Sequence, residues 1–188
     1  AAILYELGKP LKIEKLIIPD LLEGQVLIKI FYSGVCRSQL MEARGLRGAD
    51  KWLPHLLGHE ASGEVVSIGK SVSKVKKGDK VILGWIKGKG IDAPGAKYVD
   101  SKGNIINSGG VTTFSNYSIV SENRVTLIPE NIPLDVAVLF GCALPTGAGI
   151  VFNELNLKQN ENCLVIGLGG IGLSALMAIN EYKPNNLI

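Results

Sequence analysis

Residues 163–172 read CLVIGLGGIG, an unbroken apolar run followed by a glycine-rich turn. The run at 163–166 is typical of a parallel strand buried on both faces, and residues 171–182 favour a helix. The turn satisfies the pattern G-x-G-x-x-G in the strand–turn–helix setting that gives this pattern its meaning. We therefore interpret it as a dinucleotide-binding turn, with a purely structural glycine-rich turn as the alternative. Its glycines are Gly167, Gly169, Gly170 and Gly172.

Each glycine of this pattern has a physical role. The first allows the tight turn, the second lets the backbone approach a pyrophosphate, and the third lets helix and strand pack closely. The N–H groups at the start of the helix would then face the anion. The acidic residue that binds the ribose is expected about 20 residues further on, at or past Ile188, so NAD and NADP both remain candidates.

Short strands separated by turn residues are predicted upstream of this turn. Residues 25–30 alternate strictly between apolar and polar, as expected of a half-buried strand. Strands this short, with turns every ~8–12 residues, indicate a barrel or a sandwich. The predicted strands are 2–5, 11–16, 25–30, 61–68, 81–83 and 111–120.

Residues 84–110 interrupt this pattern. They hold seven glycines, few large apolar side chains and no cysteine. This composition predicts an exposed excursion, with a hairpin around residues 101–104.

Helices are predicted at a few places among the strands, and the pattern changes to α/β after Cys142. Helices are predicted at 38–43, 135–140 and 146–156. We place a domain boundary near residue 143, with a mainly β domain over residues 1–142 and the beginning of an α/β domain over residues 143–188.

Composition excludes several classes of protein. The chain has 46% hydrophobic and 20% charged residues and a net charge of +3 without a basic block, which argues against disorder and against nucleic-acid binding. Three widely spaced cysteines favour reduced thiols rather than disulfides. No signal-peptide pattern is visible and no apolar run approaches the ~20 residues of a membrane span, so we expect a cytoplasmic protein.

Three potential metal ligands lie far apart in the sequence. Cys36, His59 and Cys142 are separated by 23 and 83 residues, so they do not show the local spacing of a zinc finger. Each of them, taken alone, could be an ordinary core residue. The other histidine, His55, is interpreted as a loop residue rather than a ligand.

Five short motifs place these residues in context. They are Gly34-Val35-Cys36-Arg37-Ser38, Gly58-His59-Glu60, Gly78-Asp79-Lys80-Val81, Gly141-Cys142-Ala143-Leu144-Pro145-Thr146-Gly147 and the glycine-rich turn. In this order they resemble the medium-chain dehydrogenase/reductase family, and within it the zinc-dependent alcohol dehydrogenases. The resemblance covers essentially the whole chain. It implies a GroES-like barrel for residues 1–142 and the first β-α unit of a Rossmann domain for residues 143–188.

The resemblance also implies a ligand set for one catalytic zinc. Cys36, His59 and Cys142 occupy the positions of the three protein ligands and leave a fourth position open, as a catalytic zinc requires. Glu60 matches an acidic residue beside the metal, able to act in the second shell or to coordinate transiently. Ser38 matches a hydroxyl that passes a proton outward, although a capping serine is an equal alternative.

Cofactor and substrate positions are implied in the same way. Arg37 matches a residue that holds the cofactor pyrophosphate, and Thr146 one that lies against the nicotinamide. Trp85 falls near a position that shapes the substrate pocket, with a packing aromatic as the alternative.

The sequence departs from the family pattern at three places. Residues 84–110 lack the four cysteines that bind a structural zinc in many relatives, so we expect no structural zinc. Met41 stands where some relatives have a histidine of the proton path. Gln39 stands where many have an acidic residue that orients the ligand histidine, and its amide could accept the imidazole N–H instead.

The resulting hypothesis is a zinc-dependent oxidoreductase that transfers a hydride between an alcohol, with polyols and sugar-derived alcohols among the candidates, and NAD(P). Two alternatives stay open: a zinc-free enone or quinone reductase of the same broad family, and a non-enzymatic barrel module. The sequence lacks an initiator methionine, and we expect a piece of a longer enzyme. The piece itself is expected to be inactive, and the full-length parent to be a homo-oligomer acting on a small-molecule alcohol or carbonyl substrate.

Overall fold

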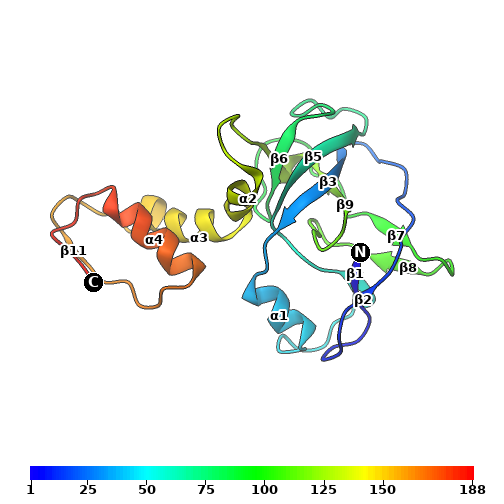
Figure 1. Ribbon diagram of the computed structural model, residues 1–188, viewed down its shortest axis with the longest axis horizontal. Helices are drawn as coiled ribbons and strands as arrows, with labels where there is room; N and C mark the ends of the chain where they lie inside the picture. The colour runs from blue at the N-terminus through cyan, green and yellow to red at the C-terminus, as the bar shows by residue number, and fades with distance from the viewer.

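The computed structural model describes residues 1–188 and shows a β body from which an α/β segment extends (Figure 1). The N-terminus lies in the β body and the C-terminus at the far end of the extension. The strands are β1 (Ala2–Leu4), β2 (Lys12–Ile13), β3 (Gln25–Ser33), β4 (His55–Leu56), β5 (Ala61–Ile68), β6 (Lys80–Leu83), β7 (Lys97–Val99), β8 (Ile105–Asn107), β9 (Tyr117–Ser121), β10 (Val125–Leu127), β11 (Asn162–Cys163) and β12 (Asn186–Leu187).

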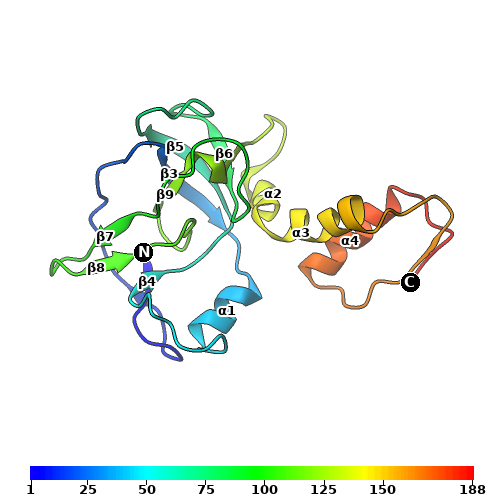
Figure 2. The same ribbon diagram turned by 180° about the vertical axis from the view of Figure 1, so that it is seen from behind.

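The helices flank the β body or belong to the extension. The view from behind shows α3 and α4 side by side, joined to the β body through α2 (Figure 2). The helices are α1 (Arg37–Ala43), η1 (Glu122–Arg124), α2 (Leu134–Ala137), η2 (Val138–Gly141), α3 (Ala143–Gly149), the π-helical turn η3 (Ile150–Glu154) and α4 (Gly170–Asn180).

The larger core lies against a five-stranded antiparallel sheet of order β10-β6-β5-β3-β9. Alternate residues of β3 and β5, such as Val26, Ile28 and Val65, are fully buried because successive side chains point to opposite faces of a strand. β3 pairs with β5 from Val26 opposite Ile68 to Ser33 opposite Ala61, with two register shifts. This pairing brings the end of β3 beside the start of β5.

The second sheet has the order β2-β1-β4-β8-β7. It includes the hairpin predicted around residues 101–104, whose turn is closed by backbone N–H groups of Lys102 and Asn104 that donate to Asp100 Oδ1. The prediction that residues 84–110 form an exposed excursion is wrong for the strands of this hairpin. Tyr98 and Ile106 of this hairpin are buried because they pack against Ile3 and its neighbours in a second core.

The boundaries of the predicted strands were met unevenly. β5 spans residues 61–68 as predicted. Of the strand predicted over residues 111–120, only the end is a strand: β9 begins at Tyr117 and ends at Ser121. The prediction that residues 163–166 form a doubly buried strand is also wrong. β11 ends at Cys163, and Leu164 and Ile166 are 65% and 90% exposed, because β11 pairs with β12 alone and no layer covers these side chains.

A small apolar cluster holds the extension together. Val151, Ala178 and Ile179 are buried where α3, η3 and α4 pack against each other. No single helix is long and apolar enough to cross a membrane; Leu134–Gly141 and Ala143–Glu154 meet that criterion only as a pair bent by 54°.

Candidate active site

Three side chains from distant segments converge where α1, β5 and α3 begin. Cys36 precedes α1, His59 precedes β5, and Cys142 lies between η2 and α3. Their ligand atoms all lie within 4.8 Å of one another, and His59 Nε2 is 3.2 Å from Cys142 Sγ. All three residues are partly buried. The structure thus brings together the three zinc ligands that the resemblance implies.

Strand pairing accounts for this convergence. The antiparallel pairing of Ser33 with Ala61 places the segment that follows β3 beside the segment that precedes β5, and so brings Cys36 near His59. The third ligand arrives through Gly141, where a Cβ atom would overlap with the carbonyl oxygen of Leu83 at the end of β6. This contact between η2 and β6 holds Cys142 over the same end of the sheet.

Glu60 lies buried between the two cysteine segments. A Cβ atom at Gly34 would overlap with its carboxyl group, and one at Gly141 would lie 2.6 Å from its Cβ. These two glycines precede Cys36 and Cys142 in the sequence, so their lack of a side chain makes room for Glu60 between the thiols. Its Oε2 atom has no hydrogen-bond partner, and burial raises the pKa of its carboxyl group although the Ala143 backbone N–H partly opposes this.

The surroundings of Cys142, His59 and Glu60 disfavour the charged forms of these three side chains in the absence of a cation. Burial, together with the nearby Cys36 and Glu60, raises the pKa of Cys142 to about 11. Burial and the positive charge of Arg47 lower the pKa of His59, which favours the neutral imidazole that metals bind. Two thiols and one imidazole form a donor set that suits zinc and leave a fourth position for a further ligand.

A largely apolar cavity of about 640 Å³ joins this cluster to the glycine-rich turn. Cys36, Arg37, Glu60 and Cys142 line one side of it. Gly167, Gly169, Gly170 and Gly172 line the other. Residues predicted to bind metal and residues predicted to bind a nucleotide therefore share one cavity.

The turn has the backbone geometry that its glycines suggest. Gly167 has φ +94°, a conformation that L side chains rarely adopt, and a Cβ at Gly172 would overlap with the carbonyl oxygen of Gly167. α4 begins at Gly170, so its free N–H groups lie beside the cavity, where they could bind an anion.

The remaining predicted residues lie at varying distances from this cavity. Ser38 Oγ donates to Cys36 Sγ at 3.3 Å and so contacts the metal cluster directly. The Thr146 hydroxyl donates to the Cys142 carbonyl oxygen at 2.6 Å, next to a ligand. Trp85 is half-exposed and does not line the cavity; it follows Gly84, where an added Cβ would lie 3.1 Å from the carbonyl oxygen of Gly141.

Gln39 and His55 behave differently from the expectations of the sequence. Gln39 Oε1 accepts from the backbone N–H of Gly58, so it contacts the residue before His59 rather than the imidazole. His55 is not a loop residue: it forms β4 and is 7% exposed. The only sequence signal for its burial is the apolar run Leu56-Leu57 that follows it.

Comparison with known proteins identifies the class to which this fold and site belong. The chain belongs to the alcohol dehydrogenase GroES-like domain family, whose model matches residues 22–130. This confirms the predicted GroES-like fold and the resemblance to zinc-type alcohol dehydrogenases.

Solved structures of related proteins cover the entire chain. It is similar to an alcohol dehydrogenase zinc-binding domain protein from Burkholderia ambifaria, with a TM-score of 0.88 and 25% identity over 100% of this chain and 57% of that one. It is also similar to benzyl alcohol dehydrogenase from Acinetobacter calcoaceticus, with a TM-score of 0.83 and 27% identity over 100% and 56%. The 2R,3R-butanediol dehydrogenase from Bacillus subtilis gives a TM-score of 0.74 and 26% identity over 100% and 56%. The chain thus spans a little over half the length of these relatives.

Proposed function

We propose that this chain supplies the zinc site and part of the cofactor site of an NAD(P)-dependent alcohol dehydrogenase. The observation that carries the proposal is the convergence of Cys36, His59 and Cys142 on the cavity that the glycine-rich turn also lines. A zinc-free reductase does not need two cysteines and a histidine within 4.8 Å of one another. A barrel used only for assembly does not need a nucleotide-binding turn facing them.

The chemistry of the bound groups would be simple: zinc polarises the oxygen of an alcohol or carbonyl, and NAD(P) exchanges a hydride with the adjacent carbon. Cys36, His59 and Cys142 would hold the metal and leave a position open beside the cavity. The Ser38 hydroxyl, beside Cys36 Sγ, is placed to carry a proton away from that position.

Two further groups contribute to binding of the metal or the cofactor rather than to proton transfer. Glu60, buried with one free oxygen, would lie beside the metal and could supply a further oxygen ligand. Arg37 and the N–H groups at the start of α4 provide positive charge for the cofactor pyrophosphate from opposite sides of the cavity.

Substrate class follows from the cavity and the relatives. The cavity wall is mostly apolar, which suits a small alcohol or its carbonyl product. The similar structures include enzymes named for benzyl alcohol and for 2R,3R-butanediol. We therefore extend the proposal to a small primary or secondary alcohol, with one catalytic zinc and without the four-cysteine structural zinc of many relatives.

The first experiment is the metal content of the purified chain, measured by mass spectrometry. We expect each of the variants Cys36→Ala, His59→Ala and Cys142→Ala to bind about one zinc ion per chain fewer than the unsubstituted chain. Cys163→Ala is the matched control, because Cys163 is an equally half-buried thiol outside the cluster. An unchanged zinc content in all three ligand variants, or the absence of zinc from the folded parent, would refute the site.

A further inference from the structure

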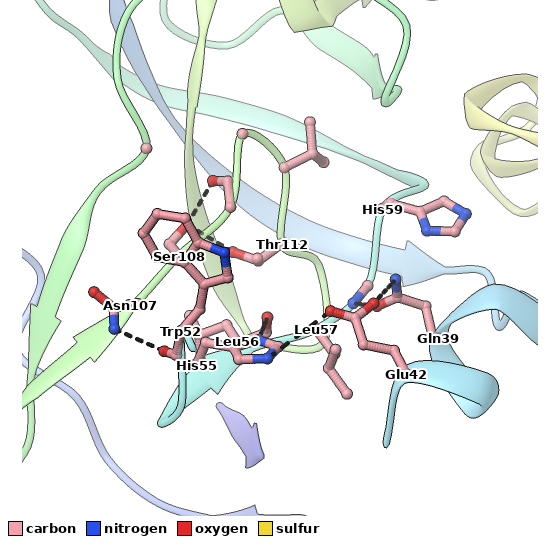
Figure 3. A pocket seen from close by; sticks show the side chains of 15 residues that line it. Gln39, Glu42, Trp52, His55, Leu56, Leu57, His59, Asn107, Ser108 and Thr112 are labelled. Carbon is pink, nitrogen blue, oxygen red and sulfur yellow. Dashed lines mark hydrogen bonds and ion pairs between the residues drawn. The ribbon is translucent and has the colours of Figure 1, made fainter. Parts of the chain in front are cut away.

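A second cluster of metal-binding side chains lies away from the thiols. His55 Nε2 is 2.7 Å from Asp50 Oδ2 and 3.8 Å from Glu42 Oε1. One ligand atom from each of these three residues lies within 4.8 Å of the other two. Glu42 comes from α1, Asp50 from the loop that follows it, and His55 from β4. Figure 3 shows Glu42 and His55 pointing toward each other at one side of a cavity of about 320 Å³.

The hydrogen bond made by the other ring nitrogen of His55 determines which tautomer faces the carboxylates. His55 Nδ1 lies 2.9 Å from the Leu56 carbonyl oxygen, which can only accept a hydrogen bond. Nδ1 therefore carries a proton and Nε2 is directed at the carboxylates. A backbone carbonyl that holds Nδ1–H in this way is the usual partner of a metal-binding histidine that binds through Nε2.

The carboxylate that faces Nε2 is ionised. Although burial alone would raise the pKa of Asp50, hydrogen bonds from the Trp52 backbone N–H and from His55 lower it. Asp50 Oδ2 is then only an acceptor, and a bare Nε2 lone pair at 2.7 Å from it would be repulsive. A proton or a metal cation must lie between these two atoms.

The cluster itself holds two carboxyl groups and one basic side chain, which favours a cation with more than one positive charge. Neither Asp50 nor Glu42 has a lysine or arginine nitrogen within 4.0 Å, and His55 is the only basic partner of both. Lys51, the nearest lysine in the sequence, extends instead over the Trp52 ring at 5.0 Å. Even a protonated His55 would leave the two carboxylates with a net negative charge, which a divalent ion would neutralise.

We propose that Glu42, Asp50 and His55 form a second metal site, which takes a divalent ion such as zinc through one imidazole nitrogen and two carboxylate oxygens. This donor set suits borderline divalent transition metals. Tetrahedral zinc with bonds of about 2.0 Å places its ligand atoms roughly 3.3 Å apart. Asp50 would recede from Nε2 by a few tenths of an ångström and Glu42 would approach by a similar amount, and the cavity would supply the remaining position.

Such a site would connect the loop between α1 and β4 to the thiol cluster. Gln39 Nε2 donates to Glu42 Oε2 at 3.4 Å, and Gln39 Oε1 accepts from the backbone N–H of Gly58, the residue before His59. A metal ion that fixes Glu42 would also fix Gln39 and, through it, the backbone that carries His59. The second ion would thus act as a structural staple beside the first.

The test removes the three proposed metal ligands of the thiol cluster, so that the zinc binding that remains reports on the second site. In a chain carrying Cys36→Ser, His59→Ala and Cys142→Ser together, zinc titration against a chromophoric chelator should still show about one equivalent bound, and zinc should raise its melting temperature. Adding Glu42→Gln or His55→Gln should weaken this binding by at least roughly tenfold. Adding Glu130→Gln, an exposed glutamate in the turn after β10, should leave it unchanged.

Two results would overturn the proposal. One is a triple variant that is folded by circular dichroism and binds no zinc at concentrations that saturate the unsubstituted chain; a proton would then occupy the gap between His55 and Asp50. The other is equal binding with and without Glu42→Gln. If the triple variant does not fold, Glu42→Gln in the unsubstituted chain must lower the zinc content from about two ions to about one, and an unchanged content would refute the site.

Discussion

A Cβ atom placed on Gly34 would lie 2.6 Å from Cδ of Glu60, well inside van der Waals contact. The same two residues are joined by a hydrogen bond of 3.1 Å from Gly34 N–H to the Glu60 carbonyl oxygen. Gly34 therefore keeps the end of β3 close to the start of β5, next to Cys36 and His59. The glycine two residues before Cys36 is a packing requirement of the site.

Replacing this glycine should damage both stability and metal binding. In Gly34→Ala the added methyl group must displace Glu60 or separate the strands, which should lower the free energy of unfolding by about 1–3 kcal/mol. It should also weaken zinc binding because the segments that carry Cys36 and His59 would move apart. Urea denaturation and zinc titration measure the two effects. Gly109→Ala is the control, since its Cβ would meet nothing closer than 3.9 Å; equal stability of the two variants would contradict this account.

Metal affinity at the thiol cluster should fall steeply as the pH falls. The pKa of Cys142 is raised to about 11, so in the metal-free chain this thiol is protonated at pH 7–8 and must lose its proton to bind zinc. Calorimetric titration in buffers of different ionisation enthalpy measures the protons released. At pH 8 the Cys142→Ser variant should release about one proton fewer than the unsubstituted chain. Equal proton release would show that Cys142 does not bind as a thiolate.

Glu122 should make stability depend on pH in the acid range. Its buried carboxylate accepts from the backbone N–H groups of Ser73 at 2.6 Å, Lys74 at 2.7 Å and Ile91 at 2.8 Å. Burial alone would raise the pKa of Glu122, but these hydrogen bonds lower it below its ordinary value. The folded state therefore binds the proton less tightly than the unfolded state. The stabilisation is complete above the unfolded pKa, near 4.3, and is lost as the pH falls through the lower, folded value.

The Glu122→Gln variant isolates this contribution. An amide can accept only some of these bonds and would direct its NH₂ group at a donor, so we expect a loss of about 2–3 kcal/mol at pH 7. The difference from the unsubstituted chain should shrink below about pH 4. Urea denaturation at several pH values measures it, with the exposed Glu130→Gln as the control. A difference that is constant from pH 7 to pH 3 would contradict a role for the ionised carboxylate.

Two glycines of α3 should respond in opposite directions to the same substitution. A Cβ at Gly147 would overlap with the carbonyl oxygen of Ile171 in α4, whereas one at Gly149 would meet nothing closer than Asn153 Nδ2 at 3.6 Å. Gly147→Ala should therefore separate the two helices and destabilise the extension by about 1–3 kcal/mol. Gly149→Ala should be neutral or stabilise α3 by up to ~1 kcal/mol, because alanine favours helix. Thermal unfolding of the two variants compares them directly, and equal melting temperatures would refute the packing argument.

Local sequence patterns predicted those features that depend on neighbours in the chain. Alternating apolar residues located β3, since the alternation reflects one buried and one exposed face, and β5 spans the residues predicted for it. The turn around residues 101–104 and the start of α4 at Gly170 were likewise visible as turn chemistry. The exposure of Leu164 and Ile166 was not predictable from an apolar run, because burial requires a second layer that local sequence does not describe.

The sequence and the tertiary structure likewise determined different properties of the site. The sequence by itself determined which residues could bind a metal, because Cys36, His59 and Cys142 stand in short motifs that resemble those of zinc-dependent alcohol dehydrogenases. Only the tertiary structure brought these residues, up to 83 positions apart, within 4.8 Å of one another, since their distance depends on the pairing of β3 with β5 and the packing of η2 on β6. It also placed His55 beside Asp50 and Glu42, a contact between three segments that no periodicity or spacing in the sequence encodes.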